Sequence, residues 1–484
     1  MRSRLVGCGF VALSAIAVLS GCGTFLPNYK LPDNTAEAQF KEAIAANKGA
    51  YRGQEKWWEV FGDPKLNELE ENAGRGSTQL RAAAARVTQA RAVARISDAD
   101  LLPTVTLQPS ATRERLSANR PVQPGSPVAG YSANRFRVPL DVAYEVDIWG
   151  KIRNASEAAL ARADAASDAF YTVMLTLQGD VAQNYFSLRA LDAERAILRD
   201  TLELRIQGLD FVRARYKGGI TNELDVTRAE TEFASTEAEM IGIGKRRAEL
   251  ENALAVLQGI SPTQFSLPES PLRATPPDVP VGLPSELLQR RPDVAEAERL
   301  LAARNAEIGV AKAAFFPSIR LTGQLGLDSG DLSDLLKSPS RVGFFGVGLQ
   351  LPIFEGGRNK ANLERSRAAF EENLAQYRER VLVAFQEVEN GLAGLRVLAQ
   401  QSEAEGRSVS SAKKSTQISN TRYKAGLVPY LEVIDAERTA LTNQRLLTQL
   451  AGQRLVTSVA LIKALGGGWR IGEQTATASP TRKN

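Results

Sequence analysis

The residue types that most often carry catalysis or bind metals are scarce in this chain of 484 residues. It contains no histidine, which removes the commonest general base and the commonest metal ligand. Its only cysteines are Cys8 and Cys22, both near the N-terminus. We therefore predict no catalytic residue, no metal site and no cofactor, and the net charge of +5 is too small to favour nucleic acid. An enzyme built from carboxylates alone, such as a glycosidase, is the alternative.

Cys22 is placed for covalent lipid attachment. Residues 1–19 combine two arginines with an apolar run that has the length of a secretory signal and is too short to span a membrane. The run ends in Leu19-Ser20-Gly21-Cys22, the bacterial lipobox pattern, in which the thiol accepts a diacylglycerol. Acyl chains would anchor the mature chain, and Gly23 permits export to the outer membrane. An ordinary signal with an incidental cysteine is the alternative.

Two carboxylates near the C-terminus could act together by charge. Glu432 and Asp435 are three residues apart, so a helix places both on one face, and Leu431 lies one turn from Asp435. Repeated by symmetry around a pore, such acids would favour cations. As ordinary acids near a helix N-terminus, they would only be solvated and stabilised by the helix dipole.

An internal duplication supplies the elements that position these residues. Four blocks recur in one order with nearly constant separation: residues 101–105 and 315–319, 148–153 and 353–358, 215–220 and 422–427, 224–230 and 431–437. Each half reads as helix, strand, loop, strand, very long helix, turn and helix. The predicted segments are a signal peptide (1–21), a lipid-anchored segment (22–63), a first repeat (64–260), a proline-rich linker (261–284), a second repeat (285–468) and a C-terminal tail (469–484).

The strands are expected near residues 104–113, 137–148, 318–327 and 345–354, with exposed loops at 114–135 and 328–344. In the second strand, Leu140, Val142 and Tyr144 alternate with Asp141 and Glu145. This alternation is typical of strands that cross a bilayer with lipid on one face and water on the other. A half-buried strand of a soluble sheet alternates in the same way.

The helices are predicted to be unusually long. No proline interrupts residues 151–215 or 358–422, so each segment predicts one helix of about 98 Å at 1.5 Å per residue. Apolar residues at steps of three and four give each a coiled-coil seam. Tight turns follow at Gly218-Gly219 and Ala425-Gly426, and helices return at 222–258 and 430–465. The helices expected at 64–99 and 285–313 could stack end to end on the returning helices.

Four strands cannot close a barrel, and open sheet edges are not viable in hydrocarbon. Three copies would supply twelve strands, within the known range of outer-membrane barrels. The predicted fold class is therefore a mixed α and β membrane protein. Each chain contributes four strands to a trimeric 12-stranded transmembrane β-barrel and long helices to a periplasmic α-helical barrel, all built from an internal duplication.

Further motifs extend over essentially the whole mature chain: Pro27-Asn28-Tyr29, Trp57-Trp58, Asp63-Pro64, Leu283-Pro284-Ser285, Arg290-Arg291-Pro292-Asp293-Val294 and Phe316-Pro317. Together with the repeat, they make the chain resemble the outer membrane factor family, the TolC-like channel tunnels. Within it, the chain is similar to the lipoprotein branch that serves resistance-nodulation-division pumps. Taken alone, the Pro292-Asp293 step has a structural explanation, because both residues suit the first turn of a helix.

The resemblance implies the outer-membrane exit channel of a tripartite efflux pump, which passively conducts substrates to the exterior. It implies a homotrimer, a periplasmic adaptor (membrane fusion) protein, an inner-membrane resistance-nodulation-division pump and outer-membrane lipid as partners. The expected location is the cell outer membrane, lipid-anchored and extending into the periplasm. A periplasmic adaptor lipoprotein is the alternative, although adaptors lack four bilayer-length strands and this duplication.

The resemblance also places Glu432 and Asp435 at the periplasmic gate, where the family carries acidic residues. Leu431, one turn from Asp435, could add an apolar ring there. Predicted closing partners are Arg422, Tyr423 and Arg228. The turns at Gly219 and Gly426 follow the longest helices, so we expect them at the periplasmic tip. Glycine permits close backbone approach, which makes both turns predicted adaptor-docking sites. A plain helix-ending role is the alternative, and both roles are compatible.

Overall fold

The computed structural model describes residues 40–41, 56–117, 130–279 and 290–468. The chain divides into two compact units. The first, here called the sheet unit, contains Val87–Ala166 and Ala297–Gln376. The second, here called the hairpin unit, contains Asp33–Arg86, Ser167–Glu296 and Tyr377–Asn484. Cys22 and the C-terminal tail lie outside the described residues.

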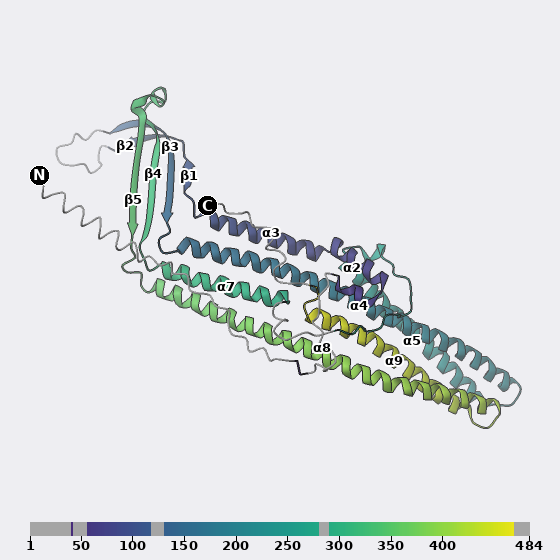
Figure 1. Ribbon diagram of the computed structural model, residues 1–484. Coiled ribbons are helices and arrows are strands. Elements are labelled where there is room, and N and C mark those ends of the chain that lie inside the picture. The colour runs from purple at the N-terminus through teal and green to yellow at the C-terminus, as the bar shows by residue number, and fades with distance from the viewer. Residues whose placement is uncertain (1–39, 42–55, 118–129, 280–289, 469–484) are drawn as a thin grey trace. The chain divides into compact units, whose positions relative to one another are not determined.

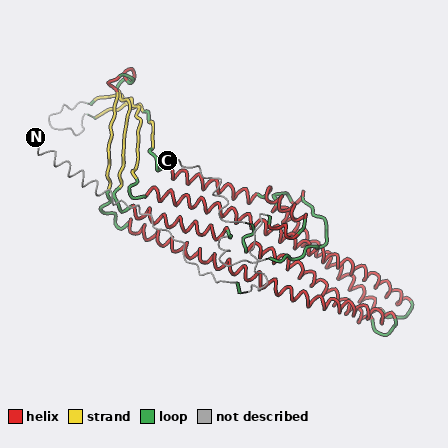
Figure 2. Tube along the Cα trace, viewed as in Figure 1, coloured by secondary structure: helices red, strands yellow, loops and turns green. Residues whose placement is uncertain are grey.

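The sheet unit holds one antiparallel sheet (Figures 1 and 2). Its strands are β1 (Thr104–Leu107), β2 (Ser110–Leu116), β3 (Tyr131–Val146), β4 (Ser318–Ser329) and β5 (Arg341–Gln350). Both β1 and β2 pair with one edge of β3, β4 pairs with the other edge, and β5 pairs with β4. Among the described strands, one open edge is therefore formed by β1 and β2, and the other by β5.

The prediction of one strand at 104–113 is wrong, because this segment forms two strands, β1 and β2. Both strands lie along the same edge of β3, so together they fill one position in the sheet. The register is the same on both sides of the break, since Leu107 pairs with Leu140 and Ser110 pairs with Arg137. Pro109 lies at the break and has no N–H to donate to the ladder. The described sheet thus has five strands in four positions.

Other predicted strand boundaries also need correction. β3 begins at Tyr131 rather than 137, and β5 begins at Arg341 rather than 345. β5 also ends at Gln350, two residues before Pro352, because proline cannot continue a ladder. The loops predicted at 114–135 and 328–344 are correspondingly shorter. The second contains the short 3-10 helices η3 (Leu332–Asp334) and η4 (Ser338–Ser340), and residues 118–129 lie outside the described chain.

The two faces of the sheet differ in polarity, as the alternation predicts. Leu107, Leu140 and Leu325 align across three strands, and all three are exposed. Exposed Phe345, Val347 and Leu349 extend the same face along β5. On the opposite face, charged and amide side chains are linked by hydrogen bonds and ion pairs across β3 and β4: Arg135, Arg137, Asp141, Gln324 and Asp328.

The two halves of the chain build matching helical hairpins. α4 (Lys151–Lys217) and α8 (Arg358–Lys424) each have 67 residues, and α5 (Glu223–Leu257) and α9 (Tyr430–Ala464) each have 35. These boundaries agree with the predicted helices to within two residues at each end. The remaining helices are α2 (Pro64–Gly76), α3 (Thr78–Ala99), α7 (Pro292–Ala313), η1 (Trp57–Phe61) and η2 (Pro262–Gln264). The single helix predicted at 64–99 is therefore wrong, because the chain bends at Ser77, which has ψ 124°.

That bend makes room for end-to-end stacking in the hairpin unit. At the end of α5, Gly259 has φ +70°, and a Cβ on it would lie 2.2 Å from the carbonyl oxygen of Gly76. At the end of α9, a Cβ on Gly466 would lie 2.1 Å from the carbonyl oxygen of Arg290, just before α7. Only glycine fits at such a close approach. The repeated contact confirms that the returning helices abut their predicted neighbours. Within the described part of the chain, no helix is both long and apolar enough to cross a membrane.

Candidate functional site

The two hairpin turns are built alike. Gly219 (φ +70°) and Gly426 (φ +75°) adopt the left-handed conformation that ends α4 and α8. In each turn the next residue closes the helix, since Ile220 donates its N–H to the Arg215 carbonyl and Leu427 donates to the Arg422 carbonyl, both at 2.9 Å. The helix-ending role of these glycines is thus observed, whereas adaptor docking stays a prediction.

Both turns also expose large apolar side chains at equivalent positions of the repeat. Ile220 and Leu427 are 67% and 71% exposed, and Leu224 and Leu431 are 54% and 41% exposed. Solvent-exposed apolar groups gathered at a turn mark a surface suited to a partner.

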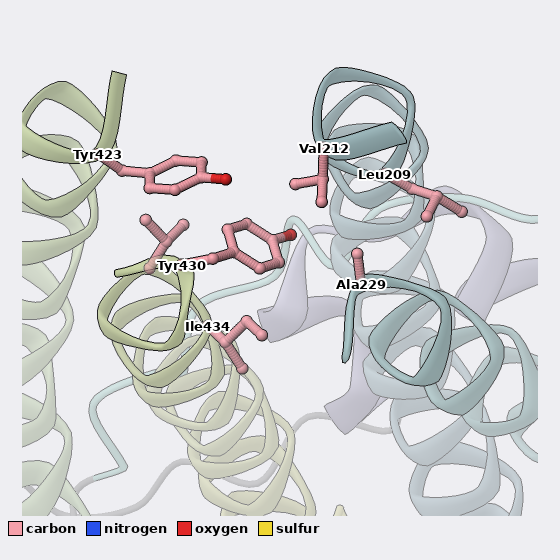
Figure 3. Close-up of a cluster of buried hydrophobic side chains, with 7 residues drawn as sticks. Leu209, Val212, Ala229, Tyr423, Tyr430 and Ile434 are labelled. Carbon is pink, nitrogen blue, oxygen red and sulfur yellow. The ribbon is translucent and has the colours of Figure 1, made fainter. Parts of the chain in front are cut away.

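A buried cluster lies just behind the turns and joins the two hairpins (Figure 3). Its members come from α4, α5, α8 and α9: Leu209, Val212, Ala229, Tyr423, Tyr430, Val433 and Ile434. The rings of Tyr423 and Tyr430 are 5.2 Å apart. Because Val433 and Ile434 are buried on α9, the neighbouring Glu432 and Asp435 are directed away from this cluster.

The structure brings together two of the predicted gate residues. The Arg422 guanidinium lies 3.2 Å from a Glu432 carboxylate oxygen, with side chains 50% and 40% exposed. Asp435 and Leu431 are exposed beside this pair. Since an exposed pair is worth at most about 1 kcal/mol, Arg422 can leave Glu432 without a large cost.

Tyr423 and Arg228 are placed differently from Arg422. Tyr423 is only 6% exposed, burial raises the pKa of its phenol, and the Arg215 guanidinium lies 5.0 Å from the centre of its ring. Arg228 lies 3.7 Å from Asp225 on its own helix. Tyr423 therefore packs against the first hairpin, and Arg228 belongs to that hairpin. The role of both residues as closing partners stays a prediction.

Buried charges near the tip were missed by sequence reasoning. Glu232 on α5 contacts Arg205 of α4 at 2.9 Å and also pairs with Arg438 of α9. The side chains of Arg205 and Glu232 are 6% and 8% exposed. The triad ties three helices together, and nothing in the spacing of these residues distinguishes them from ordinary surface charges.

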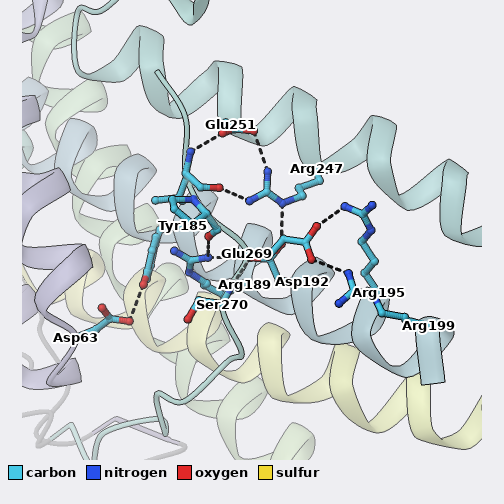
Figure 4. A network of polar contacts seen from close by, with 12 residues as sticks. Asp63, Tyr185, Arg189, Asp192, Arg195, Arg199, Arg247, Glu251, Glu269 and Ser270 are labelled. Carbon is cyan, nitrogen blue, oxygen red and sulfur yellow. Dashed lines mark hydrogen bonds and ion pairs between the residues drawn. The ribbon is translucent and has the colours of Figure 1, made fainter. Parts of the chain in front are cut away.

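A second missed network holds the inter-repeat linker (Figure 4). The buried Asp192 carboxylate forms ion pairs with Arg189 and Arg247, each at 2.7 Å. It also accepts a hydrogen bond from the backbone N–H of Ser270 in the linker, at 3.2 Å. Glu251 accepts from the Leu267 N–H and pairs with Arg247 at 2.8 Å. Hydrogen bonds from backbone N–H groups of the linker therefore hold it against α4 and α5.

The Arg291-Pro292-Asp293 motif has the structural role expected from its sequence. Arg291 is 7% exposed and lies 2.7 Å from Asp293 at the start of α7. It also donates to the Ala464 carbonyl at the end of α9 (3.2 Å). The same guanidinium therefore secures the junction between these two helices.

Comparison with known proteins decides the family. The family described as outer membrane efflux protein matches residues 70–259 and 283–467. The chain belongs to this family. It is 33% identical to the probable outer membrane lipoprotein SilC of Salmonella typhimurium, over 95% of this chain and 98% of that protein. It is also 33% identical to the cation efflux system protein CusC of Escherichia coli, over 96% and 99% of the two chains.

Solved channels share the fold. The outer-membrane channel OprN superposes with a TM-score of 0.86 at 30% identity, covering 93% of this chain and 99% of that one. The open state of the MtrE outer membrane channel of Neisseria gonorrhoeae gives 0.82 at 31% identity, covering 93% and 99%. These comparisons confirm the predicted family, the mixed α and β fold class and the outer-membrane location. The protein is an outer-membrane exit channel for efflux, and the adaptor alternative is set aside.

Proposed function

We propose that three copies of the chain close one channel and form the exit duct of a tripartite efflux pump, with no catalytic step of their own. The open-edged sheet carries this proposal. Within the described part of one chain, β1 and β2 leave one edge unpaired and β5 leaves the other, while the apolar face is exposed. Unpaired backbone groups cost several kcal/mol each in hydrocarbon. Four strand positions in each of three copies make a closed barrel of twelve.

In this assembly the tip acids act by charge. Threefold symmetry turns Glu432 and Asp435 into a ring of carboxylates, and Leu431 adds an apolar ring beside it. Arg422 lies against Glu432 of the same hairpin, and it is the cation that we propose closes the assembled ring. Opening then requires breaking exposed ion pairs rather than buried ones, which keeps the cost small.

The tip also docks the periplasmic adaptor, while an inner-membrane resistance-nodulation-division pump supplies the energy. Gly219 and Gly426 leave open space around the two turns, since a Cβ on either would meet no atom of the described chain within 4 Å. The flanking apolar side chains supply contact area. Gly426→Trp should block efflux and leave trimer assembly intact, so normal drug resistance in that variant would contradict docking here. Acylation of Cys22 adds an anchor to outer-membrane lipid.

A matched pair of substitutions tests the assembly. Phe344 and Phe345 are neighbours on β5, both exposed, and they pair with Gln324 and Gly323 on opposite faces of the sheet. Phe345→Lys puts a charge on the apolar face and should cost about 2–4 kcal/mol per copy in the bilayer. Phe344→Lys puts the same charge on the polar face.

The readout is the amount of unheated, detergent-resistant trimer in outer-membrane fractions, together with efflux of a dye. We expect Phe345→Lys to lose trimer and efflux, and Phe344→Lys to retain the trimer. Equal trimer yields from the two variants would show that the apolar face does not meet lipid.

A further inference from the structure

A cavity of about 620 Å³ lies within the hairpin unit, between α4 and the α8–α9 hairpin. Its volume is in the range of small-molecule sites, about 300–1,000 Å³. It is lined by aromatic residues from all three helices and by one carboxylate, Glu437. None of the gate acids or turn glycines belongs to its lining.

The two tyrosines of the aromatic wall are fixed by packing, and the rings of the wall are suited to a cation. Phe211 and Tyr423 meet edge to face at 6.2 Å. Tyr430 continues the wall from Tyr423, and Figure 3 shows these two tyrosines. Both tyrosines are only 6% exposed, so packing holds their rings in place. The Arg215 guanidinium lies 5.7 Å from the Phe211 ring and 5.0 Å from the Tyr423 ring. This aromatic pair therefore already accepts one positive charge from the protein itself.

The charge of Arg205 partly stabilises the ionised carboxylate in the cavity, but Arg205 forms no ion pair with it. Asn420 donates to the Glu437 Oε1 atom at 3.3 Å, and no ion pair to Glu437 is formed among the residues that the structure describes. Burial raises the pKa of Glu437, which shows the cost of holding its charge there. A cationic ligand would offset that cost.

We infer that this cavity, here called the inter-hairpin site, binds a small aromatic organic cation. The positive charge lies against Glu437, and the rings pack on Phe211, Tyr423 and Tyr430. The occupant touches both hairpins, so binding stabilises their present arrangement. Lys413 and Lys424 also line the cavity, but both are exposed on α8 and can turn toward water. The inference concerns one chain and does not depend on the proposed trimer.

Binding should weaken as pH falls. Protonation of Glu437 removes the negative charge that faces the ligand, and its raised pKa brings this change closer to neutral pH. Arg205 opposes the protonation and Glu232 favours it. The charged and titratable groups around Glu437 are Arg205 of α4, Glu232 of α5, Lys413, Tyr423 and Lys424 of α8, and Tyr430 of α9.

The test uses the purified full-length protein in detergent and titration calorimetry with tetraphenylphosphonium. Tetraphenylborate, of the same shape and opposite charge, is the ligand control. We expect one phosphonium per chain and at most weak binding of the borate. Glu437→Gln should weaken phosphonium binding about tenfold or more, since it removes a charged contact. Phe211→Leu should weaken it severalfold through the lost ring contact.

Glu230→Gln is the matched protein control. Glu230 occupies the equivalent position of the first repeat but is exposed and paired with Arg213, so its loss should leave the affinity unchanged. A double variant, Glu432→Gln with Asp435→Asn, separates this site from the gate. The inference is wrong if Glu437→Gln binds phosphonium as well as wild type, if borate binds equally, if wild type does not bind, or if the double variant alone abolishes binding.

Discussion

Glu232 offers the sharpest test of how the hairpin tip is held together. It is the acceptor shared by Arg205 and Arg438, and it joins α4, α5 and α9. Glu232→Gln keeps the shape of the side chain and removes its charge. Arg205, with 6% of its side chain exposed, then remains in the interior without its counter-ion.

The expected loss of stability in Glu232→Gln depends on the hydrogen bonds that Arg205 keeps. Removing one partner of a buried ion pair typically costs about 3–5 kcal/mol. Arg205 still donates to the Glu232 carbonyl at 2.5 Å and to the Thr236 hydroxyl, so we expect the low end, about 3 kcal/mol. At 1.4 kcal/mol per factor of ten, local opening of the tip should become about a hundredfold more frequent.

Hydrogen exchange followed by mass spectrometry measures this opening directly. Amides of α5 should exchange about a hundredfold faster in Glu232→Gln, while amides of β3 and β4 should keep their wild-type rates. Glu230→Gln is the control, because the Arg213–Glu230 pair is about half exposed and should contribute at most about 1 kcal/mol. The reasoning is refuted if the amides of α5 exchange at the same rate in Glu232→Gln and Glu230→Gln.

Three further outcomes are expected. Converting Glu432 and Asp435 to Ala should raise single-channel conductance and reduce cation preference in planar bilayers; wild-type values would place the constriction elsewhere. Cys22→Ala should lose labelling by a palmitate analogue, and equal labelling would end the lipidation hypothesis. Glu70 is 2% exposed, both carboxylate oxygens lack partners among the described residues, and burial raises its pKa well above normal. Glu70→Gln should therefore raise the melting temperature at pH 8, with a gain that shrinks on acidification as the wild-type carboxyl becomes neutral. A gain that grows at acid pH would contradict this.

Much of the fold could be predicted because local patterns specify it. The long helices follow from proline-free stretches with a coiled-coil seam, and their ends follow from Gly219 and Gly426. The strand error at 104–113 has a local cause too, since Pro109 interrupts the ladder without changing its register. The buried charges could not be predicted, because Arg205, Glu232 and Arg438 are far apart in sequence and look like surface residues until three helices meet.

The sequence by itself determined the duplication, the lengths of the hairpins, the two-faced strands and the acids beside the second turn. Only the tertiary structure decided how equivalent residues of the two repeats differ. Tyr216 and Tyr423 occupy the same position in their repeats, yet Tyr216 is 45% exposed and Tyr423 is 6% exposed. Tyr423 is buried because α8 packs with α9 against the first hairpin, where Tyr430 and Val212 cover its ring. Two copies of one pattern acquire different roles because the packing of one hairpin on the other gives them different neighbours.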